Sequence, residues 1–353
     1  MGQTIARELM VNEQSVNDGS LPFVIAEIGH NHQGDLEQAI KMIQAAAAAG
    51  ASAAKFQKRF NRTLFTPKAF NQLYNSENSF GETYGEHREF LEFGESEYRI
   101  CIDEARRCGI TFFATAFDFS SADFLEHLKM PLYKIASGDL QNTPLLRYVA
   151  EFNKPMIIST GGATLEIIDE AVKAIRATHN NFAILQCTAS YPAKFEQLNL
   201  RVISSLRDRY PENVIGYSGH DNGISMSLVA YVLGARVIEK HFTLNRASKG
   251  TDHAFSLEPT GLTKMVRDLK RAHVALGDGI KTVYENEIQA ITKMSKMIVA
   301  RKALRIGHQL SAEDVEFRSP GEGLPPSALQ GLVGRRLLVS INQHEQLRYE
   351  YFE

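Results

Sequence analysis

The chain has 353 residues and a formal net charge of −2 at pH 7, and 44% of its residues are hydrophobic. A nearly neutral chain gives no electrostatic reason to expect binding to nucleic acid or to an anionic membrane. No apolar run approaches the roughly 18 residues of a membrane span. The first 20 residues are polar, unlike a signal peptide, and the three cysteines lack metal-ligand spacing. We therefore expect a soluble, cytoplasmic protein that is long enough to bury a large core.

Eight short apolar runs alternate with amphipathic helical runs from residue 23 to about residue 276. Continuously apolar strands separated by helices are typical of a parallel sheet that is buried on both faces. Eight such units over about 250 residues predict an α/β fold, a (β/α)₈ TIM barrel over residues 1–276, with its chemistry at the carboxyl ends of the strands. An open doubly wound sheet is the alternative, but no GxGxxG fingerprint follows the first run. The expected strands are 23–28, 53–57, 111–117, 132–136, 156–160, 182–188, 214–217 and 237–241, and the expected helices include 36–49, 97–108, 121–129, 165–177 and 223–233.

The connection over residues 59–94 is far longer than an ordinary loop between a strand and a helix. Loops of this length are usually functional or disordered. Six aromatic residues in it favour an ordered lid or an arm that binds a partner: Phe65, Phe70, Tyr74, Phe80, Tyr84 and Phe90.

The pattern changes after residue 276. Residues 277–296 are polar and compatible with a helix, as expected of a linker, and residues 297–353 contain strand-like runs at 297–300 and 336–340 between turn signals. Ser311 and Ser327 stand where helix N-caps are expected. These features predict a small β-rich domain, which needs to dock on another surface to be very stable.

Two consecutive predicted strands end at histidines, His220 and His241. If the two strands are neighbours in a barrel, both imidazoles reach the same rim, where they can bind a divalent metal. Because no thiolate is expected nearby, this ligand set favours Mn²⁺ or Mg²⁺ over Zn²⁺. For each histidine taken alone, a simple hydrogen bond in the core is the alternative.

Two lysines, Lys55 and Lys134, are embedded in other predicted strands. A single lysine in such a place can be paired or can extend its amine to the surface. Together with hydroxyl side chains at equivalent strand ends, the two lysines form a ring of donors that suits a phosphate. The hydroxyls belong to Thr115, Ser137, Ser159 and Ser218.

Three further residues are candidates for catalysis, and each also has a structural alternative. Glu27 lies inside an apolar run, where it is either ion-paired with Lys55 or Lys134 or a base that orients water. Asp252 follows the last strand and either orients a metal-bound water or a sugar hydroxyl, or forms an Asx turn. Tyr191, which precedes a proline, supplies a rim hydroxyl or part of a rigid turn.

Seven short motifs follow one another along the chain. They are Ala26-Glu-Ile-Gly-His-Asn-His-Gln-Gly34, Lys55-Phe-Gln57, Thr83-Tyr-Gly-Glu-His-Arg88, Tyr133-Lys-Ile-Ala-Ser137, Leu185-Gln-Cys-Thr188, Ile215-Gly-Tyr-Ser-Gly-His220 and Glu239-Lys-His-Phe-Thr243. In this order they resemble the sialic acid synthase family, which condenses phosphoenolpyruvate with N-acetylmannosamine or a related hexose. The C-terminal segment is similar to the antifreeze-like (SAF) domain of these enzymes.

The resemblance implies a reaction and an assembly. A metal, Mn²⁺ by preference, would be bound by His220 and His241, and Glu27, Tyr191 and Asp252 would handle water and the sugar. The metal would polarise the aldehyde of the open-chain sugar, C3 of phosphoenolpyruvate would attack it, water would add at C2 and phosphate would leave by C–O cleavage. The family is typically a domain-swapped homodimer, in which the SAF domain of one subunit closes over the barrel of its partner. The implied phosphate contacts are Lys55, Thr115, Lys134, Ser137, Ser159 and Ser218.

Three departures from the family pattern lie on the sugar side. Ala189 replaces an Asn of many bacterial members, and Asp139 replaces a Glu. Ser319 replaces the Arg of the SAF domain that reads the N-acyl group, with Arg318 one position earlier. The expected sugar contacts are Asp139, Gln57 and Arg318. The three departures put the identity of the acceptor in doubt rather than the reaction.

Several alternatives stay open at this point. The acceptor is N-acetylmannosamine, or its 6-phosphate, which residues 83–88 and 186–188 favour because they resemble the animal branch, or a 2,4-diacetamido-trideoxyhexose, as in legionaminic or pseudaminic acid synthases. A related deoxy-acid phosphate synthase, or an aldolase with a Schiff base at Lys134, is a second class of function. A non-catalytic carbohydrate-binding protein that uses residues 297–353 is a third.

Overall fold

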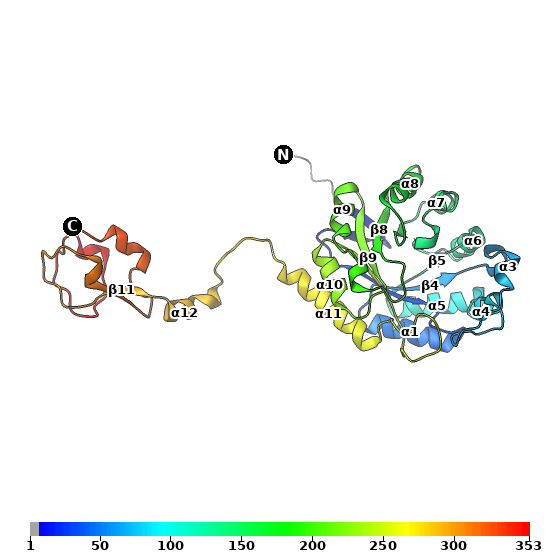
Figure 1. Ribbon diagram of the computed structural model, residues 1–353, viewed down its shortest axis with the longest axis horizontal. Helices are drawn as coiled ribbons and strands as arrows, with labels where there is room; N and C mark the ends of the chain where they lie inside the picture. Colours follow the sequence, from blue (N-terminus) through cyan, green and yellow to red (C-terminus); the bar gives the residue numbers. More distant parts are fainter. Residues whose placement is uncertain (1–6) are drawn as a thin grey trace. The chain divides into compact units, whose positions relative to one another are not determined.

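The computed structural model of the protein describes residues 7–353. The chain divides into two compact units, one that ends at Gly277 and one that begins at Asp278 (Figure 1). Each unit has its own hydrophobic core. Across the described residues, no helix combines the length and the apolar character needed to cross a bilayer.

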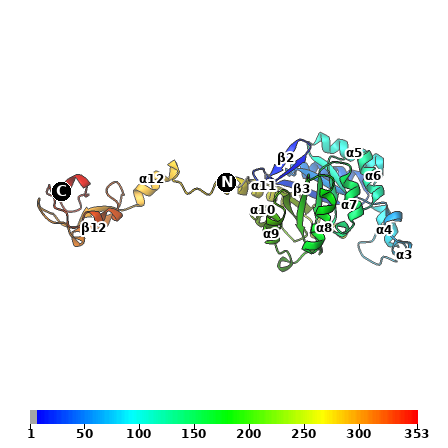
Figure 2. The same ribbon diagram turned by 90° about the horizontal axis from the view of Figure 1, so that it is seen from above.

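The first unit is built on a closed barrel of eight parallel strands, which confirms the predicted TIM barrel. Consecutive strands pair with each other, and β10 (Val237–His241) closes the ring by pairing with both β9 (Val214–Gly219) and β3 (Phe23–Gly29). Helices surround the ring (Figure 1, Figure 2), so that β3, for example, is buried along its whole length. The other strands are β4 (Ala53–Lys58), β5 (Thr111–Ala116), β6 (Tyr133–Ile135), β7 (Met156–Ser159) and β8 (Phe182–Cys187).

Helices follow the strands where amphipathic runs predict them. The first, α1 (Leu36–Ala48), begins at Asp35, whose carboxylate accepts hydrogen bonds from the backbone N–H groups of Glu37 and Gln38. Small buried residues such as Ala46 let this helix pack closely on the barrel. The other long helices of this unit are α5 (Glu95–Arg107), α6 (Phe119–His127), α7 (Thr143–Ala150), α8 (Leu165–Arg176), α9 (Val202–Arg209), α10 (Ser225–Val232) and α11 (Pro259–Ala275).

A short antiparallel hairpin precedes the barrel and was not predicted. It consists of β1 (Glu8–Val11) and β2 (Gln14–Asn17), and its Leu9 is fully buried in the barrel core. The side chain of Asn181, just before β8, forms hydrogen bonds with both backbone groups of Met10. The hairpin therefore lies at the amino ends of the strands, away from the expected site.

The long connection over residues 59–94 is ordered, as its aromatic content predicts. The rings of Phe80 and Phe90 stack with their centroids 5.0 Å apart, and the ring of Phe65 packs edge-on against Tyr84. These aromatic contacts pack parts of the segment together, although none of the four rings is fully buried and Phe90 is exposed. Its helices are α2 (Asn61–Leu64), α3 (Pro67–Phe70) and α4 (Tyr84–Phe90).

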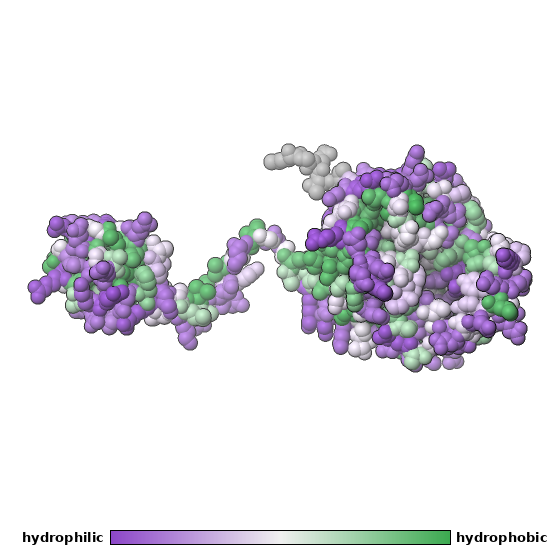
Figure 3. Space-filling view, in the orientation of Figure 1, coloured by the Kyte–Doolittle hydropathy of each residue, from purple (hydrophilic) through white to green (hydrophobic). Residues whose placement is uncertain are grey.

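The second unit starts with α12 (Glu285–Met294) and contains a two-stranded antiparallel sheet of β11 (Met297–Ala300) and β12 (Val315–Arg318). The strand expected at 297–300 is therefore confirmed. Apolar side chains along the start of the unit are exposed to solvent (Figure 3): Ile280, Val283, Ile288, Ile291 and Met294.

Two local expectations for this unit were wrong. The run 336–340 is not a strand, because residues 336 and 337 bridge to two different segments and no continuous ladder forms. Ser327 is not an N-cap, because it lies inside the 3₁₀ helix Pro326–Gly331, which Pro325 precedes. Ser311 is the N-cap of a short 3₁₀ helix, as predicted, and its backbone N–H donates to the Asp314 carboxylate at 2.9 Å.

Candidate active site

A cavity of about 690 Å³ lies at the carboxyl ends of the barrel strands. Twelve of the fourteen predicted site residues line it, although they come from widely separated parts of the chain. The barrel therefore brings together the residues that sequence patterns placed at strand ends. The twelve are Glu27, Lys55, Gln57, Thr115, Lys134, Ser137, Ser159, Tyr191, Ser218, His220, His241 and Asp252.

Four buried charged residues, which we call the floor cluster, lie deepest in the cavity: Glu27, Lys55, Lys134 and Glu239. Each is at most 4% exposed. The Lys55 Nζ lies 2.6 Å from a Glu27 oxygen and 3.6 Å from Glu239, and the Lys134 Nζ lies 3.9 Å from Glu239. Two cations thus face two anions, and the ion pair considered for Glu27 is present.

Strand register explains how the floor cluster assembles. Glu27 stands opposite Lys55 in the pairing of β3 with β4, and opposite His241 in the pairing of β10 with β3. Glu239 was missed as a candidate. The signal was available, because a residue two positions before His241 on a strand points to the same side of the sheet.

Burial and ion pairing shift the pKa values of the floor residues in different directions. Burial raises the pKa of Glu27 above its ordinary value, despite the neighbouring Lys55. Burial opposes the charge of Lys55 as well, but Glu239 and Glu27 outweigh it and raise the pKa of Lys55. For Lys134, burial prevails and lowers the pKa. Lys134 is therefore the less satisfied cation of the two and the more available to an incoming anion.

The hydroxyl groups around the floor are oriented for donation. Thr115 and Ser159 accept hydrogen bonds from the floor lysines at 3.0 and 2.7 Å, and Ser137 accepts one from a backbone N–H at 2.9 Å. Because the Thr115 and Ser159 oxygens accept, their O–H groups are free to donate to an anion, whereas the Ser137 O–H donates to the Cys187 Sγ at 3.6 Å. Ser218 differs, since its Oγ donates to Glu239 at 3.2 Å.

The two histidines lie side by side, with ring centroids 5.3 Å apart. The Nδ1 of His220 lies 2.7 Å from the carbonyl oxygen of Thr188. A carbonyl can only accept, so Nδ1 carries the proton and Nε2 keeps its lone pair. Burial and the neighbouring His241 lower the pKa of His220 to about 4. The Nδ1 of His241 is buried and has no hydrogen-bond partner. Two neutral imidazoles with free lone pairs are the form that binds a metal, so these residues fit one.

The surroundings of this pair contain a sulfur, since the Cys187 Sγ is 3.9 Å from the His220 Nδ1. Burial raises the pKa of Cys187, so it stays a neutral thiol rather than a thiolate ligand. Within residues 7–353, no three His, Cys, Asp or Glu side chains converge as a ligand set. A metal held by two imidazoles would keep several positions for water and substrate.

Tyr191 and Asp252 face the histidines from the loops. The ring centroid of Tyr191 lies 4.1 Å from that of His220, and the tyrosine is 56% exposed at the opening of the cavity. A carboxylate oxygen of Asp252 lies 3.5 Å from the His241 Nδ1. Burial opposes ionisation of Asp252, yet His241 and a hydrogen bond from Thr251 hold its pKa below the ordinary value. Asp252 is therefore a carboxylate at neutral pH.

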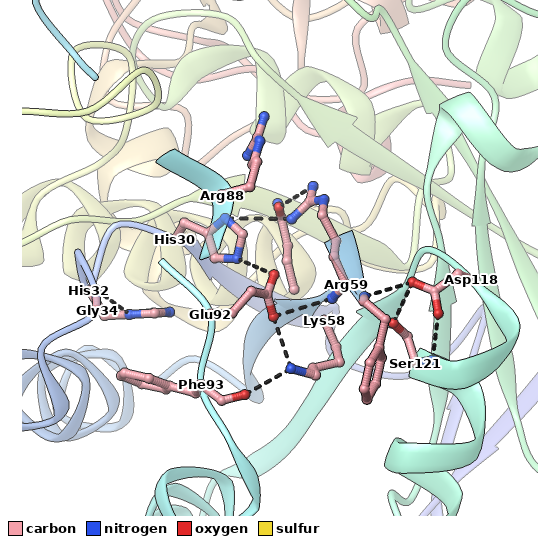
Figure 4. Close-up of polar contacts among 12 residues, drawn as sticks. His30, His32, Gly34, Lys58, Arg59, Arg88, Glu92, Phe93, Asp118 and Ser121 are labelled. Carbon is pink, nitrogen blue, oxygen red and sulfur yellow. Dashed lines mark hydrogen bonds and ion pairs between the residues drawn. The ribbon is translucent and has the colours of Figure 1, made fainter. Parts of the chain in front are cut away.

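A second group of cations, which we call the mouth cluster, lines the outer part of the same cavity: Arg59, Arg88 and Lys249. Gln57 connects it to the floor, because its amide donates to Glu27 at 2.7 Å and accepts from the Arg59 Nη2 at 2.8 Å. Figure 4 shows Arg59 and Arg88 grouped around His30. Sequence analysis did not single these three cations out, because Arg59 and Lys249 lie in irregular segments and Arg88 lies on a helix of only seven residues, so that none of them stands at the end of a predicted strand pattern.

Two predicted sugar contacts are not among the residues that line this cavity. The carboxylate of Asp139 accepts a hydrogen bond from Asn142 at 3.4 Å. Arg318 belongs to the second unit, where its Nε lies 2.8 Å from Glu316.

Comparisons with known proteins identify the family of the chain. The sequence profile of the NeuB family matches residues 42–281, and that of the SAF domain matches residues 295–353. The N-acetylneuraminate-9-phosphate synthase of Homo sapiens is 39% identical over 330 residues, which cover 93% of this chain and 92% of that protein. The N,N'-diacetyllegionaminic acid synthase of Campylobacter jejuni is 36% identical over 329 residues, which cover 92% of this chain and 98% of that protein.

A solved structure extends the comparison to three dimensions. The crystal structure of the N-acetylneuraminic acid synthetase from Leptospira borgpetersenii in complex with citrate has a TM-score of 0.70 and 34% identity, and the match covers 82% of this chain and 97% of that chain. Because the family profile spans more than half of the chain and the relatives align over nearly all of it, the chain belongs to the NeuB family and ends in a SAF domain.

Proposed function

We propose that the protein condenses phosphoenolpyruvate with an N-acyl hexosamine, N-acetylmannosamine or a close relative, to give N-acetylneuraminate or a related nine-carbon ulosonic acid and phosphate. The observation that carries this proposal is one cavity that holds both the floor cluster and two neutral imidazoles. The relatives from Homo sapiens and Campylobacter jejuni are named as synthases of such acids.

Phosphoenolpyruvate would bind on the floor. Lys134 is the less satisfied cation, and the free O–H groups around it suit phosphate oxygens, which accept several hydrogen bonds at once. Lys55, held between Glu27 and Glu239, adds a fixed positive charge. The other phosphate contacts would be the hydroxyls of Thr115, Ser137, Ser159 and Ser218. Of these, Ser137 and Ser218 would exchange their present acceptors, Cys187 and Glu239, for phosphate oxygens.

A divalent metal, Mn²⁺ with Mg²⁺ as the alternative, would be held by His220 and His241. When bound there, it would supply Lewis-acid polarisation of the aldehyde of the open-chain sugar. The hydrogen bond from His220 to the Thr188 carbonyl fixes the imidazole tautomer that such a ligand needs. Asp252, which is ionised beside His241, supplies a negative charge that favours a cation.

The reaction balances with water as a co-substrate. A bond forms between C3 of phosphoenolpyruvate and the aldehyde carbon, and the aldehyde oxygen takes a proton. Water adds at C2 and gives up a proton, after which the C2–O bond breaks to leave a ketone and free phosphate. Glu27 and Asp252 are the two carboxylates of the predicted set that can position this water, and Tyr191 can donate to the sugar from the opening of the cavity.

The first test measures phosphate release from phosphoenolpyruvate with Mn²⁺ and a panel of acceptors. The panel holds N-acetylmannosamine, its 6-phosphate and 2,4-diacetamido-trideoxyhexoses, and mass spectrometry identifies each product. Release with one acceptor and a nine-carbon product is expected. If none is released, borohydride trapping decides whether Lys134 forms a Schiff base, which the aldolase alternative requires and the synthase does not.

The homodimer belongs to the same proposal. Exposed apolar side chains at 280–294 are a surface that a second copy would cover, and residues 277–296 would be the linker through which the SAF domain reaches its partner's barrel. Light scattering should give twice the chain mass. Mixing His220→Ala with a chain truncated after residue 296 should restore part of the activity, because each variant supplies what the other lacks. A monomer, or no recovery, would contradict the swap.

A further inference from the structure

Three buried polar residues, which we call the wall triad, are bonded to one another outside the cavity: Tyr217, Asp221 and Lys240. Each is at most 1% exposed, and none of them lines the cavity. The Lys240 ammonium donates to a carboxylate oxygen of Asp221 at 3.0 Å and also to the Asp221 carbonyl. The Tyr217 hydroxyl donates to the same carboxylate oxygen at 2.6 Å. The triad therefore ties β10 to β9 and to the residues that follow β9.

The wall triad is adjacent in the chain to both histidines of the candidate metal site. Lys240 immediately precedes His241, and Asp221 immediately follows His220. Successive side chains of a strand point to opposite faces, so Lys240 points away from the cavity that His241 lines. A single side-chain bridge thus joins the backbone next to one imidazole with the backbone next to the other.

Backbone pairing between β9 and β10 stops just short of the histidines. The ladder ends with Lys240 opposite Gly219, one residue before each histidine. His241 is still paired with Glu27 on β3, but nothing in this ladder fixes it relative to His220. Within residues 7–353, the His241 Nδ1 also has no hydrogen-bond partner that would orient the ring. The bridge from Lys240 to Asp221 continues the connection between the two strands where the ladder ends.

Gly219 leaves the space that this bridge needs. A methyl group at position 219 would lie 2.5 Å from the Tyr217 ring and 2.7 Å from the Asp221 carboxylate. Contacts this short essentially never occur, so a residue without a side chain is required here. The strand end is therefore shaped around the wall triad.

We infer that Tyr217, Asp221 and Lys240 are positioning residues, which hold His220 and His241 at the separation that a divalent metal needs. This inference rests on the proposed function and deepens it, because it concerns how the proposed metal site keeps its shape. A buried ion pair adds little stability, since the cost of taking both charges out of water offsets most of their attraction. The pair does fix the relative position of the two strand ends. Residues that orient metal ligands in this way raise the affinity for the metal.

The test measures binding of Mn²⁺ alone to the full chain, by electron paramagnetic resonance of the free ion. Lys240→Met replaces the ammonium with an apolar chain of similar length. It should raise the Kd for Mn²⁺ about 10- to 100-fold, as the loss of groups that orient metal ligands usually does. Tyr217→Phe, which removes one hydroxyl, should raise the Kd by a smaller factor.

Lys58→Met is the matched control, because Lys58 is also buried and ion-paired, with Glu92 at 3.0 Å, but is not adjacent to either histidine in the chain. Both lysine variants should lower the urea concentration at which the protein unfolds, since each leaves a buried carboxylate unpaired. Only Lys240→Met should weaken Mn²⁺ binding. The Kd therefore distinguishes positioning from a general loss of stability.

Two results would overturn the inference. If Lys240→Met binds Mn²⁺ as tightly as the unchanged protein, or if Lys58→Met weakens binding equally, the wall triad supports only the fold. If circular dichroism shows that Lys240→Met does not fold, Asp221→Asn decides in its place. This variant keeps the size and the backbone carbonyl of residue 221, and it should also weaken Mn²⁺ binding.

The binding measurement is independent of turnover, which separates this inference from the proposed function. If the unchanged protein binds Mn²⁺ but releases no phosphate with any acceptor, the proposed reaction fails, and the Kd values of the variants still decide the inference. If the unchanged protein binds no Mn²⁺, the inference fails, whether or not phosphate is released.

Discussion

The floor of the cavity holds two lysines within 4 Å of carboxylates, whereas at its mouth two arginines and a lysine have no acidic partner among the described residues. On the floor the two positive and two negative charges balance, and each charged side chain is oriented by its ion-pair partner before any ligand binds. At the mouth, burial and the neighbouring Arg88 oppose the charge of Arg59, and the carboxylates of Glu92 and Asp252 offset this only in part. Lysines and carboxylates thus neutralise one another on the floor, whereas the cations at the mouth make no ion pair among the described residues.

The largest effect is expected beside the floor. His220→Ala should lower turnover at least about 1,000-fold, because the metal would lose one of two protein ligands and several kcal/mol of charge stabilisation with it. Steady-state kinetics with added Mn²⁺ measures the loss, and circular dichroism checks the fold. Cys187→Ser is the matched control, since this thiol contacts His220 and is not assigned a ligand role. Full activity of His220→Ala in metal-stripped buffer would refute the role.

A large stability effect is expected within the floor cluster itself. Glu239→Gln should lower the free energy of unfolding by about 3 kcal/mol, because Lys55 and Lys134 would lose a shared buried counter-charge. Urea unfolding measures the difference. Glu37→Gln is the control, because Glu37 pairs with Lys41 on the surface and should change stability by no more than about 0.5 kcal/mol. Equal effects of the two variants would mean that burial of the floor pairs is not decisive.

A paired carboxylate of the second unit gives a reference for the floor cluster. Asp314 accepts from His308 at 2.8 Å and from the Ser311 N–H at 2.9 Å. Burial opposes its ionisation, but these hydrogen bonds and Lys302 hold the pKa of Asp314 below its ordinary value. Its contribution is therefore complete above about pH 4 and is lost as the pH falls through the lowered pKa.

Asp314→Asn should lower the free energy of unfolding by about 1–2 kcal/mol at pH 7, in line with the loss of a cap and its hydrogen bonds, and by less at low pH. Unfolding of the full chain, followed at pH 7 and pH 3, measures the cost. An equal loss of stability at pH 7 and at pH 3 would contradict the lowered pKa of Asp314.

The smallest change in the free energy of unfolding is expected at the mouth cluster, and its sign is opposite to that of Glu239→Gln. Arg59→Met should leave the free energy of unfolding unchanged or raise it by up to about 1 kcal/mol, because it replaces a buried, unpaired charge with an apolar chain of similar length. The same urea experiment measures it. A loss above about 2 kcal/mol would mean that Arg59 is already satisfied without a ligand.

Much of this architecture could be predicted because barrel strands carry a local signal. Continuous apolar runs predicted all eight strands. Because polar residues at the carboxyl ends of barrel strands share one rim, residues as distant in the sequence as Lys55 and His241 could be predicted to line the same cavity. Glu239 was overlooked although its spacing from His241 was readable. The hairpin at 8–17 was missed, because strands of four residues with mixed polarity resemble a loop.

The mouth cluster could not be predicted in the same way. Arg59 and Lys249 come from irregular segments and Arg88 from the short helix α4, and their meeting depends on how the segment 59–94 folds over the barrel. Likewise, 336–340 has the composition of a strand but finds no single partner to pair with. Local pattern predicts regular elements, whereas the placement of irregular segments is a property of the whole fold.

The closing strand of the barrel has a consequence for biosynthesis. Glu239 lies on β10, the last of the eight strands to leave the ribosome, while Lys55 and Lys134 lie on β4 and β6. A nascent chain that has not yet released β10 would enclose two ammonium groups with Glu27 as their only floor counter-charge. Closure of the ring therefore also balances the charges of the floor cluster. A barrel without β10, the strand that carries His241, is less stable because its two buried lysines share a single carboxylate.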